Sequence, residues 1–261
     1  MKRFLAPICL GSLAVVLFGC LDSEPDDSVA SSPTSVADRG NQYATDVAAF
    51  ERAVGKNEDL TPEQIHKIME EIRNSPIFKN TFMGVSTLQN PTDLWILMEI
   101  MYEMKPDLIV EAGTFHGGSA GLWAILLEHM NPDGRVITID IDDRRDKRAI
   151  DWPISNRKVD FLLGSSTDPA IVADVHRRAK GKRVMVILDS LHSKEHVANE
   201  LNAYAPLIPV GGYIVVQDTK AGPLQAIDEF LAANRSFVAD RAKERYSDTN
   251  TVRGYLKRVR P

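Results

Sequence analysis

From about residue 105 onward, short continuous apolar runs alternate with longer segments of helical spacing. Continuous runs are typical of strands covered on both faces, because a strand with one solvated face alternates apolar and polar positions. The pattern therefore predicts a doubly wound, mostly parallel, seven-stranded α/β sheet of Rossmann-like type. The strands are expected at 107–111, 135–140, 159–163, 183–189, 212–217, 236–239 and 252–259, with helices at 118–130, from Asp168-Pro169, 194–204 and 223–233.

Residues 43–104 are predicted to form an N-terminal helical cover on that sheet. Thr61-Pro62-Glu63-Gln64 combines a capping residue, a proline at the first helical position and Gln at the capping-box position. A second helix begins at Asn90-Pro91. Its expected apolar face consists of Leu94, Trp95, Leu97, Met98 and Met101.

The first 42 residues carry the pattern of a targeting segment and a linker. Lys2 and Arg3 precede an apolar run that is short for a bilayer span and ends at Gly19-Cys20. This resembles a bacterial lipoprotein signal at 1–19 with Cys20 as the lipidated residue; a plain secretory signal or an uncleaved anchor is the alternative. Residues 20–42 are poor in apolar side chains and are expected to be a flexible tether. The expected location is a bacterial membrane after export, with the outer membrane favoured by Leu21.

Charge and cysteine content narrow the classes of partner. The formal net charge is −5, and no basic stripe would neutralise phosphates, so no nucleic-acid partner is expected. Of the two cysteines, Cys9 falls in the signal and Cys20 comes directly at its end. The domain at 105–261 therefore has neither a disulfide nor a cysteine-ligated metal.

The segment 111–119 joins the first predicted strand to its helix and includes Gly113, Gly117 and Ser119. Glycines there permit a tight turn and close approach of a ligand to the helix start, where exposed N–H groups favour a carboxylate. Asp140 ends the next strand, where its carboxylate could accept hydrogen bonds from ribose hydroxyls. The single early glycine departs from the Gly-x-Gly-x-x-Gly pattern and favours S-adenosylmethionine over NAD.

Several segments together resemble the cephalosporin hydroxylase family, which includes rhamnosyl O-methyltransferases. They are Lys105–Ala120, Leu188–Ser193, Glu200–Pro206, Gly211–Thr219 and Gly254–Arg258, with Gly84 and Pro91–Asp93 upstream. The resemblance implies an S-adenosylmethionine-dependent O-methyltransferase that uses a divalent metal, usually Mg²⁺. It also implies a cofactor site lined by Glu111, Gly113, Ser119, Asp140 and Ser165.

Asp189, Gln217 and Asp218 follow two strands that are expected to be neighbours. Their oxygen atoms would suit Mg²⁺, which could lower the pKa of a bound hydroxyl and align it with the methyl group. The family usually has Glu-Asp where this chain has Gln217-Asp218, so one charge is missing. The alternative is that these residues only cap strand ends.

His192 lies three residues after Asp189, at the spacing where catechol-type methyltransferases have a lysine that takes the substrate proton. It is predicted, with Asp189, to be catalytic; a hydrogen-bonded residue at the next helix start is the alternative. His196 is a less favoured base, and His116 is expected to pack near the cofactor. Trp123 and Tyr204 are expected in the core.

The leading functional hypothesis is methylation of a hydroxyl on a small molecule or glycan. A membrane-bound binding protein that kept the fold without turnover is a second hypothesis, because S-adenosylmethionine is made in the cytoplasm. A hydroxylase or oxidoreductase ranks last, since no flavin, NAD or two-His-one-carboxylate iron pattern is found in the sequence. The N-terminal helices leave a homo-oligomer open.

Overall fold

The computed structural model describes residues 61, 63–64, 67, 80–219 and 222–261. These residues belong to one compact unit, Asp46–Pro261. The expected signal at 1–19, Cys20 and the tether at 20–42 lie outside the described residues, as does most of 43–79. No helix in the described ranges has the length and hydropathy needed to cross a bilayer.

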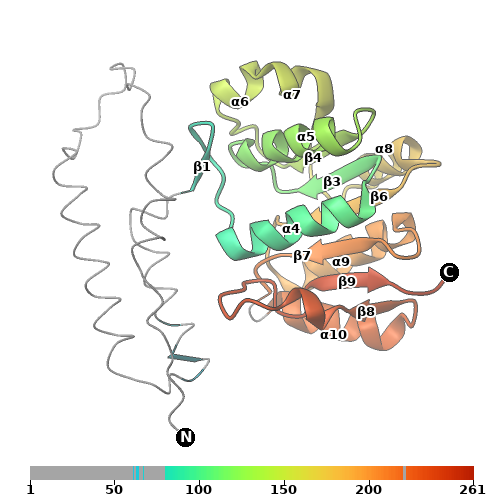
Figure 1. Ribbon diagram of the computed structural model, residues 1–261. Coiled ribbons are helices and arrows are strands. Elements are labelled where there is room, and N and C mark those ends of the chain that lie inside the picture. The colour runs from blue at the N-terminus through green and yellow to red at the C-terminus, as the bar shows by residue number, and fades with distance from the viewer. Residues whose placement is uncertain (1–60, 62, 65–66, 68–79, 220–221) are drawn as a thin grey trace, which may run out of the picture. The chain divides into compact units, whose positions relative to one another are not determined.

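A seven-stranded sheet forms the centre of the unit, in the order β5-β4-β3-β6-β7-β9-β8 (Figure 1). The first five strands in that order are parallel, and β9 is antiparallel to both of its neighbours. The order reverses at β3, which is flanked by β4 and β6, so the carboxyl ends of these strands border a crevice. The bounds are β3 Leu108–Ala112, β4 Arg135–Asp140, β5 Val159–Leu163, β6 Val184–Leu188, β7 Tyr213–Val216, β8 Phe237–Ala239 and β9 Tyr255–Arg258.

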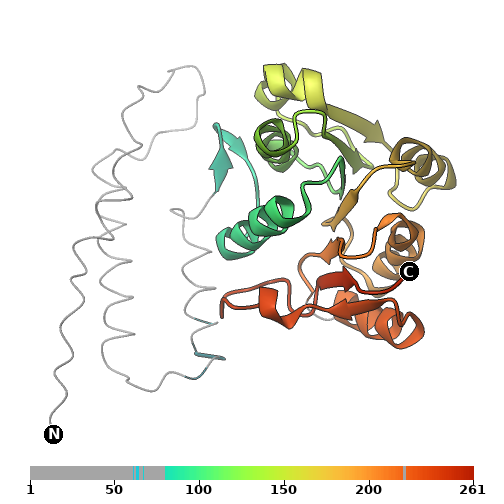
Figure 2. The same ribbon diagram turned by 45° about the vertical axis from the view of Figure 1, so that its right-hand side comes forward.

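Helices cover both faces of the sheet, as Figure 2 shows. Apolar side chains of α4 (Pro91–Met104), α5 (Gly118–Met130), α6 (Lys147–Asp151) and α7 (Pro153–Lys158) pack on one face. Those of α8 (Pro169–Ala179), α9 (Lys194–Tyr204) and α10 (Gly222–Ala233) pack on the other. Successive residues of β3 point to opposite faces, so Val110 joins the second layer and Ile109 the first. The predicted fold class is confirmed.

The N-terminal side of the unit agrees in part with the expected cover. The capping box is present, because Thr61 N donates to Gln64 Oε1 and Gln64 N donates to Thr61 Oγ1. The helix α4 begins after Asn90, whose side chain accepts a hydrogen bond from Thr92 N. Its expected apolar face was wrong at Trp95, which is 54% exposed and donates to Glu99. The buried face is Asp93, Ile96, Leu97, Ile100 and Met101.

Three features were not predicted from the sequence. A hairpin of β1 (Thr81–Phe82) and β2 (Val85–Ser86) precedes α4. Two short helices, α6 and α7, connect β4 to β5, and both are capped by local chemistry: Asp146 accepts from Arg148 N, and Pro153 opens α7. The last strand begins at Tyr255 instead of Val252, because the chain turns at 252–254. Short 3-10 helices lie at Ala205–Leu207 and Arg241–Lys243.

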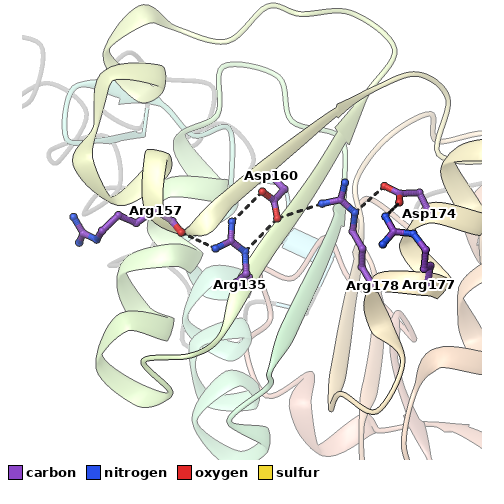
Figure 3. A network of polar contacts seen from close by, with 6 residues as sticks. All are labelled: Arg135, Arg157, Asp160, Asp174, Arg177 and Arg178. Carbon is purple, nitrogen blue, oxygen red and sulfur yellow. Dashed lines mark hydrogen bonds and ion pairs between the residues drawn. The ribbon is translucent and has the colours of Figure 1, made fainter.

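At the amino ends of the strands, acids and arginines form an extended network (Figure 3). Arg135 at the start of β4 donates two hydrogen bonds to Asp160, at 2.9 and 3.2 Å. Arg178 joins Asp160 to Asp174, at 3.5 and 2.7 Å. This edge of the sheet is thus neutralised by the protein's own side chains.

Candidate functional site

A cavity of about 600 Å³ opens at the carboxyl ends of the parallel strands. The loops that follow β3, β4, β5, β6 and β7 contribute to its wall, together with the segment between β2 and α4. Of the predicted site residues, Gly113, Ser119, Asp140, Ser165, Asp189, His192 and Asp218 line it. Glu111, Gly117 and Gln217 do not line this cavity.

The loop after β3 is held against the neighbouring strand ends by backbone contacts. Gly113 has φ +98°, and a Cβ atom at this position would lie 2.0 Å from Asp189 O. Only glycine therefore allows the loops after β3 and β6 to approach so closely. Asp140 Oδ2 accepts hydrogen bonds from Thr114 N and Phe115 N, at 3.0 and 2.8 Å. The acid that was expected to bind ribose hydroxyls also fixes this loop.

Glu111 points away from the cavity, toward α5. Its carboxylate accepts hydrogen bonds from Trp123 Nε1 at 2.7 Å and from Thr138 Oγ1 at 2.6 Å. Burial raises the pKa of Glu111 to about 7, although these hydrogen bonds and one from Ser119 act in the opposite direction. Glu111 is 1% exposed and does not line the cavity. It contacts the cavity only indirectly, through its hydrogen bond with Ser119. Trp123 is in the core as expected.

Asp189, His192 and Asp218 converge at one end of the cavity, with one potential ligand atom from each within 4.8 Å of the others. His192 Nε2 lies 3.3 Å from Asp189 Oδ1. Burial raises the pKa of Asp189, and the nearby Asp218 carboxylate adds to this, whereas His192 opposes it. The hydrogen bond with Asp189 raises the pKa of His192. Asp218 has φ +49°, an unusual backbone conformation that occurs frequently at functional sites.

Gln217 is joined to this cluster through Gln89. Its Nε2 donates to Gln89 Oε1 at 2.7 Å, and its Oε1 accepts from Gln89 Nε2 at 3.2 Å. Gln89 Nε2 also donates to Asp189 Oδ2 at 2.9 Å. In this structure Gln217 Oε1 accepts one of its two possible hydrogen bonds from Gln89, and its role as a cation ligand stays a prediction.

A second polar cluster, not predicted as a unit, lies beside the cavity. Glu200 is fully buried, and its Oε1 accepts hydrogen bonds from Ser166 and Ser190, at 2.5 and 2.7 Å. His196 Nε2 lies 3.2 Å from the same oxygen, and this contact raises the pKa of His196. Glu200 thus ties the loop after β5 to the loop after β6. Tyr204, a core residue as expected, donates to Ser166 O.

The residues missed from the sequence act across long stretches of chain. Gln89 contacts partners 100 and 128 positions away, and Glu200 joins loops from two strands. No local motif marks either residue, although Glu200 does begin one of the segments that resemble the family. His116 stacks on Phe115, with ring centroids 3.8 Å apart, and does not line the cavity.

Comparison with known proteins gives one family. Residues 75–259 match the family model described as rhamnosyl O-methyltransferase/CmcI. A rhamnosyl O-methyltransferase of Mycobacterium tuberculosis (strain ATCC 25618 / H37Rv) is 34% identical over 188 residues, covering 66% of this chain and 74% of the relative. One from Mycobacterium leprae (strain TN) is 30% identical over 197 residues, covering 68% and 82%.

Solved structures share the fold. An apo structure of CmcI has a TM-score of 0.58 and 21% identity, covering 79% of this chain and 87% of CmcI. A CmcI structure with Mg and S-adenosylmethionine has a TM-score of 0.57 and 21% identity, covering 78% and 87%. The chain belongs to the rhamnosyl O-methyltransferase/CmcI family, which confirms the family and the O-methyltransferase reaction class expected from its sequence.

Proposed function

We propose that this protein transfers the methyl group of S-adenosylmethionine to a hydroxyl of a deoxyhexosyl group, with a divalent cation at the Asp189–Asp218 end of the cavity. The main support for this proposal is that two groups of residues line the same cavity. One group is Asp189, His192 and Asp218, and the other is Gly113, Ser119 and Asp140. One part of the cavity has the features of a nucleoside site and the other has those of a cation site. Together they supply a donor site and an acceptor site in one space.

The nucleoside part suits S-adenosylmethionine. Ser119 lies in the first turn of α5, where free N–H groups attract the carboxylate of the methionine portion. Asp140 Oδ1 is engaged only by Asp142 N, at 3.2 Å, among the described residues, which leaves it capacity to accept from ribose hydroxyls. Ser165 lines the cavity after β5 and can offer its hydroxyl to the rest of the nucleoside.

The donor set at the other end fits a hard divalent cation. Two carboxylates face one small space, and carboxylate oxygens are the ligands that Mg²⁺ prefers. Asp189 and Asp218 would hold the cation, and the rest of its shell would be water and the acceptor hydroxyl. When bound, the cation stabilises negative charge on that oxygen. It would also counteract the burial and the Asp218 charge that raise the pKa of Asp189.

The acceptor would contact an apolar rim beside the catalytic groups. Leu88 and Leu191 both line the cavity and are 66% and 62% exposed. Each is close in sequence to a polar site residue: Leu88 precedes Gln89, and Leu191 precedes His192. A deoxyhexose has a methyl group and a C–H face that such leucines can cover, while its hydroxyls face the polar groups. The rhamnosyl part of the relatives' name describes a sugar of this kind.

His192 is positioned to accept the proton. Its Nε2 can donate to Asp189 Oδ1, 3.3 Å away, which leaves Nδ1 as the nitrogen that accepts a proton, and the residue lines the cavity. As the acceptor oxygen forms its bond to the methyl carbon, the bond from that carbon to sulfur breaks, and the hydroxyl proton moves to His192. The products are the methyl ether, S-adenosylhomocysteine and a protonated imidazole, which releases its proton to water.

The test measures transfer of labelled methyl from S-adenosylmethionine to a soluble rhamnoside. We expect an O-methylated product with Mg²⁺, loss of product when a chelator is added, and recovery when excess Mg²⁺ is restored. Calorimetric binding of S-adenosylhomocysteine is measured alongside. Binding without any transfer would favour a protein that kept the fold for binding alone, and no binding at all would refute the proposal.

We further propose that the chain is an exported lipoprotein anchored through Cys20, on the basis of Lys2-Arg3, the apolar run after them and Gly19-Cys20. Metabolic labelling with a palmitate analogue should mark the wild type and not Cys20→Ser. Equal labelling of both proteins would remove this proposal without affecting the enzymatic one.

A further inference from the structure

The orientation of the Gln89 and Gln217 side-chain amides follows from one hydrogen-bond acceptor, the Asp189 carboxylate. An ionised Asp189 carboxylate only accepts hydrogen bonds, so Gln89 must turn its NH₂ group toward Asp189 Oδ2, 2.9 Å away. The same NH₂ group faces Gln217, which must therefore present its carbonyl oxygen. Gln217 then donates its own NH₂ to Gln89 Oε1. With Asp189 ionised, these three contacts set the orientation of both amides.

This pair is built into the molecule and does not lie on its surface. Gln89 and Gln217 are 6% and 5% exposed, and each makes hydrogen bonds that would be costly to lose at such burial. Gln89 is also held by its backbone, because its carbonyl oxygen accepts from Asn80 Nδ2 at 2.7 Å. The segment before α4 thus delivers one fixed amide to two residues at the ends of β6 and β7.

The arrangement changes which residues are free to hold a cation. Gln89 lines the cavity and Gln217 does not. The Gln217 carbonyl oxygen, the only atom of that side chain that could ligate a cation, accepts a hydrogen bond from Gln89. Asp189, in contrast, accepts from Gln89 with Oδ2 and keeps Oδ1 on the side of His192.

We propose that Gln89 is a positioning residue for the cation site: it holds Asp189 in its ligating orientation and keeps Gln217 out of the ligand set. This role rests on the proposed cation-dependent function. Gln217 then acts only through Gln89, as a support that keeps the Gln89 amide from rotating. Outer contacts of this kind commonly change metal affinity by about 10- to 100-fold when removed.

The experiment is a double-mutant cycle read out by direct cation binding. Mn²⁺ is titrated into the full chain saturated with S-adenosylhomocysteine, and free Mn²⁺ is measured by electron paramagnetic resonance. The variants are Gln89→Met, Gln217→Met and the double variant; methionine has a similar length and no amide. Gln225→Met, at an exposed glutamine of α10, is the matched control. Thermal unfolding and S-adenosylhomocysteine affinity verify that each variant is folded.

We expect Gln89→Met to weaken Mn²⁺ binding by about tenfold, while S-adenosylhomocysteine affinity stays within about twofold. Gln217→Met should weaken it less, and adding Gln217→Met to Gln89→Met should have almost no further effect, because the support has nothing left to hold. In the Gln89→Met background, Gln217→Glu should restore binding, since the carboxylate is then free to reach the cation.

Other results overturn the inference in distinguishable ways. Unchanged Mn²⁺ affinity in Gln89→Met would remove the positioning role and leave the proposed function intact. Fully additive losses in the double variant would show that Gln217 is itself a ligand. A wild-type protein that binds no Mn²⁺ and transfers methyl groups in the presence of a chelator would remove the cation from the proposed function, and the role of Gln89 with it.

Discussion

The two ends of the same parallel strands treat their acids in opposite ways. At the amino ends, Asp107 pairs with Arg183. Asp160 in β5 and Asp174 in the adjacent α8 also pair with arginines (Figure 3). At the carboxyl ends, Glu111, Asp140, Asp189 and Asp218 form no ion pair with Lys or Arg in the described part of the chain; His192 is the basic group beside Asp189. Asp140, Asp189 and Asp218 line the cavity without a Lys or Arg partner among the described residues, so they are available to a ligand, whereas a paired acid serves the fold. The cavity at the carboxyl ends is therefore distinguished by acids without a Lys or Arg partner in the described part of the chain, as well as by the identity of its residues.

The sharpest way to break this comparison is to neutralise one acid at each edge. Asp189→Asn removes a carboxylate that the proposed cation needs, so methyl transfer should fall by about 1,000-fold. Asp160→Asn, matched in chemistry and located at the opposite edge, should change transfer by less than about twofold and lower the unfolding temperature instead. Equal losses of activity in the two variants would mean that the edges do not differ in function.

His192 differs from the arginines of the amino edge because it can lose its charge near neutral pH. The hydrogen bond with Asp189 raises its pKa, so the neutral form that accepts a proton predominates only above a pKa that is higher than the usual histidine value. Methyl transfer should fall as pH decreases through that value. His192→Gln should lower transfer by about 100-fold and remove the acidic limb from the profile of rate against pH. A limb that persists in His192→Gln would assign the titration to another group.

Stability should also depend on pH in opposite directions at the two edges. The folded-state pKa of Glu111 is raised to about 7 from 4.5, so the protonated form is favoured in the fold. The protonated Glu111 side chain contributes fully to the free energy of unfolding below pH 4.5, and this contribution is lost as pH rises toward 7. Glu111→Gln, which keeps the shape without the charge, should therefore raise the free energy of unfolding at pH 8 by up to about 3 kcal/mol.

The same substitution should have little effect at pH 4.5, where Glu111 is already protonated in the fold. Urea unfolding of the protein without ligand at the two pH values measures the difference. A destabilised Glu111→Gln at pH 8 would show that the hydrogen bonds from Trp123 and Thr138 outweigh the cost of burying the charge.

The sequence predicted the strands, their order of appearance and the acids at their ends, because continuous apolar runs report burial on both faces. It could not predict which face Glu111 occupies, since a strand covered on both sides has no polar side to set the register. Trp95 was misplaced for a related reason: α4 is apolar around most of its circumference, so periodicity did not single out its buried stripe. Gln89 was missed because its role depends on partners far away in the chain, and a lone buried glutamine has no local signature.

The smallest expected effect is on the stability of the fold at the amino edge, where the pH dependence should have the opposite sign to that of Glu111. Arg183 lowers the pKa of Asp107 to about 2, so this carboxylate stabilises the fold above its unfolded pKa near 4 and ceases to do so as pH falls toward 2. Because the pair is about one-third exposed on the Asp107 side, the loss in Asp107→Asn should be about 1 kcal/mol at pH 7. Near pH 2 the variant and the wild type should unfold with the same free energy.

Asp107 directly precedes β3, and Glu111 lies near the end of the same strand, four positions later. Although they are so close in sequence, the two carboxyl groups should give the free energy of unfolding pH dependences of opposite sign. If Asp107→Asn and Glu111→Gln shift the free energy of unfolding in the same direction at neutral pH, the pairing of acids at one edge and not at the other does not determine their contributions to stability.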